Sequence, residues 1–362
     1  MTPGQIALRA LIVGFIVSFA VITGFAYTTL LERKVLARLQ HRVGPNRAGY
    51  IPIPGRSGER RFLGGFLQPA ADAVKLFFKE DFRPSAADPW IYTLAPMLAV
   101  IPAILILAVI PWMHGFRLGN LIFEPYFAIA PNVNVGVLFI LAITSIGIYG
   151  VVLGGWASAS KYSVMGGIRA SAQMISYELA LGLSLLPPIM LAGSMDLGEI
   201  VAVQGEWKVP FALLQPIAAV IFYIGALAEL QRHPFDLLEA EQELSSGYNV
   251  EYGGMRFGMF FMAEYMKMIS LSAIFATLYL GGYYGPIPFA EQVPIIGLIN
   301  ITIKIVASLF LMIWIRASWP RFRYDQLMAL GWKRLLPLSL ANVVLTAAVI
   351  ILFDEGLLAS LF

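Results

Sequence analysis

Residues 134–157 read NVGVLFILAITSIGIYGVVLGGWA, an unbroken run without a charged side chain. An α-helix rises about 1.5 Å per residue, so about 20 such residues cross the roughly 30 Å of hydrocarbon in a bilayer. The run lacks the alternation of polar and apolar residues that is typical of strands in outer-membrane barrels. It therefore predicts a transmembrane helix.

Seven further segments have the same character. They cover residues 8–30, 91–112, 170–192, 210–230, 257–281, 293–315 and 336–358. Charged residues make up 13% of the 362-residue chain, about half of the roughly 25% found in soluble proteins. The chain is therefore predicted to be an all-α polytopic membrane protein with about eight transmembrane helices, which form one membrane domain over residues 1–362.

Basic residues gather on one side of this predicted bundle. Most of the 25 lysine and arginine residues fall in the loops that face inward if the N-terminus is outside, and the outer loops hold only Arg117 and Lys208. Inner loops of membrane proteins carry such an excess. Both termini are therefore expected on the outer face of the bacterial cytoplasmic (inner) membrane, or of the mitochondrial inner membrane if the chain is organellar. The counterparts of the basic loops are then membrane lipid and partner subunits, and no nucleic acid is expected.

The first inner loop contains a helical pattern. Within residues 63–79 the apolar side chains recur at helical spacing, while Asp72, Lys75 and Lys79 share the opposite face. Such a pattern predicts an amphipathic helix that lies along the membrane interface. A surface helix with a solvated polar face and no further role is the alternative.

The residue inventory excludes several kinds of chemistry. The chain has no cysteine, so it can hold neither a disulfide nor a thiolate-bound iron–sulfur cluster. Its three histidines lie outside the predicted spans, which argues against haem, and no metal site is expected. Glycine-rich nucleotide-binding motifs are absent too. If the chain takes part in redox work, its electrons come from another subunit.

Ionisable residues inside the predicted spans are the strongest functional signal. Among them are Glu178, Glu229, Glu264, Lys267 and Lys304. A charge at the centre of a span costs about 2.5–3.5 kcal/mol on insertion scales, so such residues face the protein interior or a water-filled cavity. Buried carboxylates can serve a proton relay. The alternatives are that Glu264 and Lys267 form only an internal ion pair, and that Lys304 snorkels or pairs structurally.

Two inner loops concentrate charge. Residues 228–243, AELQRHPFDLLEAEQE, are acidic apart from Arg232, and residues 314–325, WIRASWPRFRYD, set arginines among aromatic residues. The first could be a solvated acidic loop or a partner for the basic loops. The second could be an interfacial anchor of arginine and aromatic side chains.

Taken together, these segments resemble the H subunit of the proton-pumping NADH:quinone oxidoreductase, respiratory complex I, over essentially the whole chain. The segments that carry the resemblance are ERK at 32–34, RVGPN at 42–46, QPAADAVKL at 68–76, AELQRHPFDL at 228–237, EAE at 239–241, FMAEY at 261–265 and RASWPRFRYDQL at 316–327. Their order and their places between the spans make the resemblance specific. Leu238, where many members have proline, is a minor departure.

The resemblance implies a quinone chamber framed by the first, sixth and seventh spans and the interfacial helix. The substrate would be a quinone, expected to be ubiquinone. Electrons would come from the terminal iron–sulfur cluster of a hydrophilic partner, while NADH, flavin and the clusters stay in partner subunits and this chain binds no cofactor. The implied charge relay toward antiporter-like membrane subunits is Glu178, Glu229, Asp236, Glu239, Glu241 and Glu264. The implied chamber residues are Arg33, Asp72, Lys75, Phe235, Arg316 and Arg321.

Two other classes of protein fit part of this pattern. A secondary transporter would use the same buried acids to bind coupling ions, although internal repeats are not evident and the first inner loop is long and structured. The related anchoring subunit of membrane-bound hydrogenases need not use quinone. Copurification would distinguish a transporter from a complex I subunit, because a transporter is stable alone and a complex I subunit should purify together with many other subunits.

Overall fold

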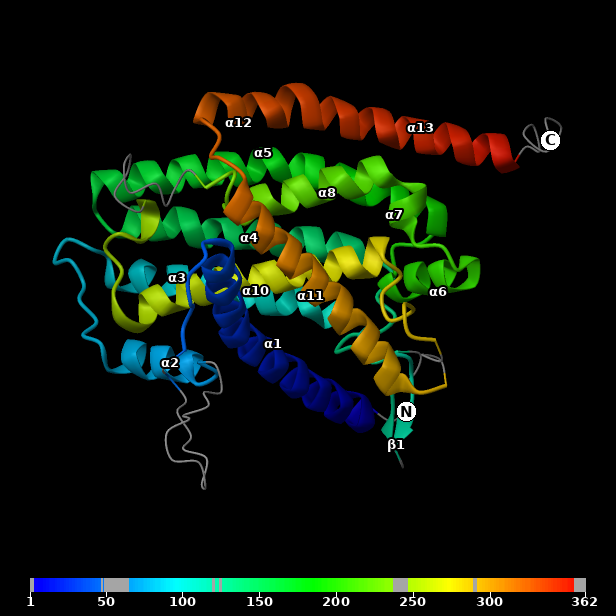
Figure 1. Ribbon diagram of the computed structural model, residues 1–362, viewed down its shortest axis with the longest axis horizontal. Coiled ribbons are helices and arrows are strands. Elements are labelled where there is room, and N and C mark those ends of the chain that lie inside the picture. The colour runs from blue at the N-terminus through cyan, green and yellow to red at the C-terminus, as the bar shows by residue number, and fades with distance from the viewer. Residues whose placement is uncertain are drawn as a thin grey trace.

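The computed structural model describes residues 3–46, 48, 65–118, 121–123, 126–236, 247–288 and 292–354. Over these ranges the chain forms a bundle of long helices that run between two ends (Figure 1). Seven helices among the described residues are long and apolar enough to cross a membrane. A shorter apolar helix accompanies them. These observations confirm the predicted all-α polytopic membrane protein.

The long helices follow the predicted spans. They are α1 (Pro3–Leu39), α3 (Pro89–Leu105), α4 (Gly136–Ala157), α5 (Lys161–Ala192), α10 (Gly254–Tyr279), α11 (Pro294–Ser318) and α13 (Leu336–Asp354). A 3₁₀ turn, η1 (Ile106–Val109), extends α3, and a π-helical turn, η3 (Gly331–Leu335), joins α12 (Tyr324–Leu330) to α13. The remaining elements are α2 (Gln68–Phe78), α6 (Leu197–Trp207), α7 (Phe211–Leu214), α8 (Pro216–Glu229), the turn η2 (Gly247–Asn249), and the antiparallel strands β1 (Arg117–Leu118) and β2 (Leu121–Ile122).

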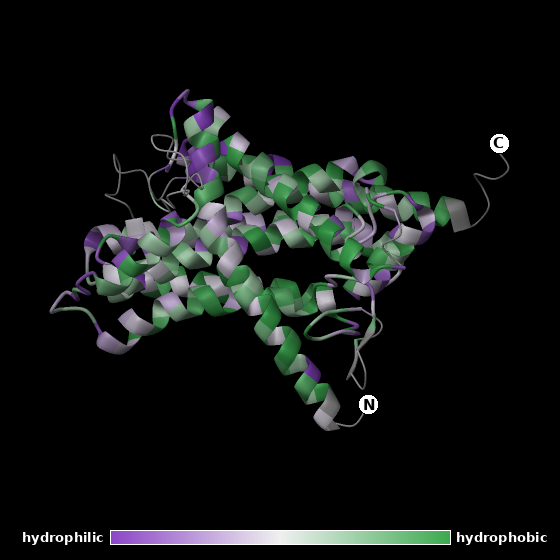
Figure 2. Cartoon of the chain, turned by 60° about the horizontal axis from the view of Figure 1, so that its bottom comes forward, coloured by the Kyte–Doolittle hydropathy of each residue, from purple (hydrophilic) through white to green (hydrophobic). Residues whose placement is uncertain are grey.

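The two ends of the bundle carry different elements. One end, here called the α2 end, holds α2, the ends of α1, α8 and α11, and the starts of α3 and α10 (Figure 1). The opposite end, the α6 end, holds α6, α7, β1, the start of α1 and the finish of α13. Hydrophobic residues cover most of the long helices, and hydrophilic residues gather at the ends and in the loops (Figure 2). This distribution suits a bundle that crosses a bilayer from one end to the other.

Helix α1 continues well beyond its predicted span. The span was predicted to finish at residue 30, but the helix runs through Glu32, Arg33 and Lys34 to Leu39. Glutamate, arginine and lysine have high helix propensity, so a cluster of them does not interrupt a helix. At about 1.5 Å per residue the 37 residues of α1 extend roughly 55 Å, which is longer than the hydrocarbon core. The last turns of α1 therefore lie among the loops of the α2 end.

The fifth predicted span, residues 210–230, is interrupted. Its two helices, α7 and α8, meet at Gln215, which has φ −127° and ψ 59°. Pro216 lacks an amide hydrogen and its ring clashes with a preceding helical turn, so it starts a new helix and does not continue the old one. The side-chain oxygen of Gln215 accepts hydrogen bonds from Asn342 Nδ2 at 3.4 Å and Thr346 Oγ1 at 3.3 Å. Helix α13 thus satisfies polar groups at the break.

Small residues allow helices α3 and α4 to pack closely. A Cβ at Gly150 of α4 would lie 2.7 Å from the amide nitrogen of Ala99 and 2.9 Å from the carbonyl oxygen of Ala95. Both are backbone atoms of α3 and could not move aside cheaply. Membrane helices use glycine in this way because close backbone approach maximises packing in the absence of a hydrophobic driving force.

Helix α2 is the interfacial helix expected from residues 63–79. It begins at Gln68 with Pro69 in its first turn, and it packs against α1 and α10 at the α2 end. Asp72 on its polar side is bonded to Arg33 Nη1 of α1 at 2.6 Å, while Phe77 and Phe78 are exposed. The amphipathic helix is therefore held to the bundle by packing and by the ion pair of Asp72 with Arg33, and it leaves apolar side chains exposed.

Candidate functional site

A buried carboxylate in α1 is the centre of a charged network at the α2 end. Glu32 is 2% exposed. Its two oxygens accept hydrogen bonds from different arginines: Arg232 Nη1 donates to Oε2 at 2.5 Å, and Arg316 Nη1 of α11 donates to Oε1. The extension of α1 past residue 30 is what brings this carboxylate into the bundle.

Arg232 connects Glu32 to a second carboxylate. Its Nε donates to Glu264 Oε1 of α10 at 2.7 Å, and its guanidinium lies 4.4 Å from the ring centroid of Tyr265. Burial alone would lower the pKa of Arg232, but the carboxylates of Glu264 and Glu32 raise it above its usual range. The guanidinium is 3% exposed and stays charged.

The result is an alternating chain of four charges, which we call the charge chain: Arg316, Glu32, Arg232 and Glu264. Buried ions are costly unless each has an opposite charge and satisfied hydrogen bonds. The alternation meets this requirement, because each inner member contacts two opposite charges. The chain joins α1, α10, α11 and the turn that follows α8.

The turn after α8 holds Arg232 in place. Gln173 of α5 donates from Nε2 to the carbonyl oxygens of Ala228 at 2.8 Å and Phe235 at 3.0 Å, so one amide side chain spans the turn. Gln231 within it has a positive φ of 55°. The ring of Phe235 stacks on Phe322 with a centroid distance of 5.6 Å, and it contacts the tilted ring of Tyr177 of α5 at 5.5 Å. Phe235 is therefore a buried packing residue of this turn.

A second ion cluster lies in the same turn. Asp236 is 2% exposed, and its Oδ2 lies 3.2 Å from Arg321 Nη2 and 3.1 Å from His233 Nε2. The amide nitrogen of Phe322 also donates to the carbonyl oxygen of Pro234 at 3.0 Å. These contacts fasten the turn after α8 to the segment between α11 and α12, which are the two loops that concentrate charge in the sequence.

Glu229 occupies a separate position at the end of α8. It is 5% exposed, and its Oε2 is buried without a hydrogen-bond partner among the described residues. A cavity of about 30 Å³ adjoins it and is also lined by Glu264 and Lys267. The lining is mostly apolar, but these three charged side chains give a water in this space polar partners. Glu229 and Glu264 thus line one small cavity.

Glu178 lies in α5 on the side facing α4. Ser145 and Thr144 of α4 donate their hydroxyl groups to Glu178 Oε1, the second at 3.4 Å. Lys267 of α10 also reaches toward α4, because a Cβ at Gly147 would lie only 3.0 Å from its Nζ. The charges of Lys267 and Glu178 are the ones that act on Glu229. The carboxylates of α5, α8 and α10 thus lie within electrostatic reach of one another.

The structure places the remaining predicted residues as follows. Lys75 is exposed on α2. Glu239 and Glu241 lie outside the described residues. The ion pair that the structure gives to Glu264 is with Arg232 and not with Lys267, the partner in its own helix. Across the described ranges, no group of three or more histidine, aspartate or glutamate side chains could hold a metal ion.

Three members of the network were not selected from the sequence. Glu32 stands beside Arg33 and Lys34 in the segment ERK, and the sequence does not mark it as a site residue. In the sequence, Arg232 stands out only as the single arginine of an acidic segment. Tyr265 stands out only as the last residue of the FMAEY motif. A signal for Arg232 was present, because a lone arginine among five acids suggests that it neutralises some of them. Glu32 offered no local signal.

The fold and this site together define a class of protein: a polytopic membrane protein that buries paired charges at one end of its helical bundle. A family model described as NADH dehydrogenase matches residues 12–347. The match spans most of the chain, and the chain therefore belongs to the NADH dehydrogenase family.

Similar proteins carry more specific names, all of them H subunits of an NADH-quinone oxidoreductase. One from Syntrophobacter fumaroxidans is 49% identical over 323 residues, which cover 89% of this chain and 90% of that protein. Another from Geobacter metallireducens is 48% identical over 340 residues, 93% of this chain and 95% of that protein. A third from Deinococcus deserti is 47% identical over 348 residues, 94% of this chain and 83% of that protein. The expected resemblance to a membrane subunit of an oxidoreductase complex is confirmed.

Proposed function

We propose that this chain forms much of a quinone-binding chamber at its α2 end and couples quinone reduction to proton translocation through its buried carboxylates. The observation that carries the proposal is the charge chain, which connects three helices and a turn and approaches the cavity shared by Glu264 and Glu229. An ion pair that only stabilises the fold needs two charged groups. Four alternating charges in contact can transmit a change of charge from one end of the charge chain to the other.

The chemistry of quinone reduction is consistent with this role of the charge chain. Reduction of a quinone to a quinol consumes two protons, and charge near the headgroup changes while it happens. A new negative charge beside Arg316 or Arg321 competes with Glu32 or Asp236 for the guanidinium groups. A carboxylate that loses its guanidinium becomes easier to protonate, so the protonation of neighbouring groups changes as a coupled set. The electrons come from a partner, because this chain has no cysteine to hold an iron–sulfur cluster.

The chamber itself needs an apolar route and a polar end. The exposed apolar side chains of α2 and α1 supply the route for a hydrophobic tail. The pair of Arg33 and Asp72, with Lys75 nearby in sequence, supplies hydrogen-bonding groups for a headgroup. The chamber is completed by a hydrophilic partner that carries the terminal iron–sulfur cluster and docks on the α2 end. The α2 end then faces the cytoplasm of a bacterium, with antiporter-like subunits beside the bundle in the membrane.

The test of the coupling role is substitution of Glu229 in the assembled, membrane-embedded complex. Glu229→Gln keeps the size and hydrogen-bonding capacity of the side chain but removes the titratable charge. Because proton transfer groups contribute about 100-fold or more, we expect quinone-linked turnover and proton translocation to fall together by about tenfold or more. Glu229→Asp remains titratable and should retain more activity than the glutamine variant.

Glu206→Gln provides the matched control, since Glu206 is an exposed glutamate of α6 at the opposite end of the bundle. Complex content is checked by NADH oxidation with a hydrophilic acceptor, which bypasses the quinone site. A packing role for Glu229 predicts the opposite order, with the isosteric amide more active than the shorter aspartate. Near-normal turnover and pumping in Glu229→Gln would remove this residue from the relay.

A further inference from the structure

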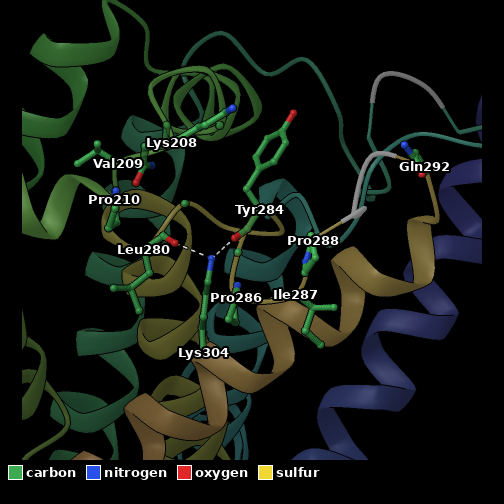
Figure 3. A pocket seen from close by; sticks show the side chains of 14 residues that line it. Lys208, Val209, Pro210, Leu280, Tyr284, Pro286, Ile287, Pro288, Gln292 and Lys304 are labelled. Atoms are coloured by element: carbon green, nitrogen blue, oxygen red, sulfur yellow. Dashed lines mark hydrogen bonds between the residues drawn. The ribbon is translucent and has the colours of Figure 1, made fainter.

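A large pocket opens at the α6 end, far along the bundle from the charge chain. It has a volume of about 720 Å³ and lies between the link from α6 to α7 and the loop from α10 to α11. Figure 3 shows Lys304 at its base, with Lys208 and Tyr284 along one side and Pro288 and Gln292 along the other. Pockets of a few hundred to about 1,000 Å³ are typical of small-molecule sites.

The base of the pocket is a buried cation. Lys304 of α11 donates its ammonium hydrogens to the carbonyl oxygens of Leu280 at 2.5 Å, Gly282 at 2.8 Å and Tyr284. Figure 3 shows the bonds to Leu280 and Tyr284. Gly285 leaves space for this side chain, because a Cβ there would lie 2.9 Å from Lys304 Nζ. All three ammonium hydrogens have acceptors, and each acceptor that the described residues supply is a neutral carbonyl. Within the described part of the chain, the hydrogen bonds of Lys304 are satisfied and no carboxylate compensates its charge.

The other charged residue of the lining is also a cation. Among the described residues that line the pocket, the charged ones are Lys208 and Lys304, and no carboxylate is among them. Lys208 ends α6 in the left-handed conformation, with φ 55° and ψ 21°. Glycine is the residue that helices usually have at such a position, because a side chain there is strained. A lysine held in a conformation that favours glycine suggests that its charge is used.

The walls of the pocket suit an amphiphile. Val209, Pro210, Pro286 and Ile287 line it with apolar surface. The pocket lies where α10 finishes and α11 begins, which is the depth at which membrane-spanning helices meet the lipid headgroups. Two positive charges and apolar walls at this depth match a negatively charged headgroup whose acyl chains continue beside the bundle.

We propose that this pocket binds an anionic, phosphate-bearing headgroup, with the phosphate attracted by Lys208 and Lys304 and with its source a lipid of the adjoining leaflet. The bound anion supplies the counter-charge that the carbonyl cage of Lys304 lacks. A buried charge without a counter-charge is costly. The loop from α10 to α11 is therefore more stable with the headgroup bound. Free phosphate shares the same chemistry and is the second possible source.

The experiment uses the intact complex in nanodiscs of phosphatidylcholine that contain a small fraction of phosphatidylglycerol with a photoreactive headgroup. Peptide mass spectrometry measures how much label is captured by residues 204–210 and 280–288. Lys208→Gly removes the cation and also suits the φ of 55°, so the variant does not introduce backbone strain. One basic residue near a membrane surface is worth about fivefold in binding anionic lipid, so capture should fall about fivefold. Lys208→Arg keeps the cation and should capture label as the parent chain does.

Competition by unlabelled compounds shows whether the bound anion is a lipid headgroup or free phosphate. Unlabelled phosphatidylglycerol should suppress the capture, while phosphatidylcholine should not. Suppression by inorganic phosphate as strong as that by phosphatidylglycerol would support the anion site and assign it to the free ion. Equal capture by the parent chain and Lys208→Gly, absence of capture in the parent chain, or equal competition by the two lipids would each overturn the proposal.

Discussion

Arg232 is the residue whose replacement should disturb the site most. It makes two charge-assisted hydrogen bonds, at 2.5 Å to Glu32 and 2.7 Å to Glu264, and it is 3% exposed. Removing one partner from a buried ion pair costs about 3–5 kcal/mol, because the other charge is left unpaired. Glu32 retains Arg316 as a partner, so Glu264 is the carboxylate that Arg232→Met leaves unpaired. We expect this variant to lose about 3–5 kcal/mol of stability.

A second substitution separates this reason from a general packing defect. Glu264→Gln in the Arg232→Met background replaces the unpaired carboxylate with a neutral amide of the same shape. The double variant should therefore recover more than half of the loss, since the unpaired charge is the larger part of it. The control is Arg323→Met, which removes an arginine that is 82% exposed and paired with Asp325 at the surface. Exposed pairs contribute about 0–1 kcal/mol.

The assay is the loss of quinone reductase activity with temperature in membranes, together with the amount of assembled complex found by the hydrophilic-acceptor reaction. The order of stability should be parent chain and Arg323→Met, then the double variant, then Arg232→Met. A double variant no more stable than Arg232→Met would refute the charge chain as a balanced set, because the unpaired Glu264 would then cost nothing.

Two further predictions concern α2 and the packing of the bundle. Lys75→Ala should lower quinone reductase turnover by about tenfold, because a hydrogen bond from a charged group contributes about 1.5 kcal/mol. Hydrophilic-acceptor activity and assembly should stay unchanged, and equal loss of both activities would give this helix a role in assembly alone. Gly150→Val should cost about 1–3 kcal/mol through overpacking against α3 and reduce the assembled complex found on native gels. Gly182→Ala, where a Cβ meets only Leu141 side-chain atoms at 3.8 and 3.9 Å, should leave assembly intact, and equal loss in both variants would argue against close packing as the cause.

Most of the transmembrane helices could be predicted from the sequence, because a membrane-spanning helix depends on the local composition of the chain. A run such as 134–157 must cross the hydrocarbon whatever its neighbours are, and α4 occupies residues 136–157. The extent of α1 was less predictable, because a cluster of charges marks a membrane boundary and not a helix end. The break at Gln215 had a visible cause in Pro216, but an apolar run with a proline in its interior is still predicted to be a span.

The partners within the site depend on tertiary structure. Glu264 and Lys267 are spaced to meet on one helix, and the pairing of Glu264 with Arg232 requires a turn that the sequence does not specify. Glu32 is about 200 residues from Arg232 and about 280 from Arg316, so no sequence window contains the charge chain. Residue types indicated where charge is buried, and only the packing of α1, α10 and α11 indicates which charges meet.

Helix α1 has a mechanical consequence for these contacts. Adjacent residues on an α-helix point about 100° apart, so Glu32 faces the charge chain while Arg33 faces α2 and holds Asp72. A twist or an axial slide of α1 displaces both side chains at once. The ion pair with α2 and the contact with Arg232 therefore rest on neighbouring residues of one helix, so the position of α1 sets both contacts together.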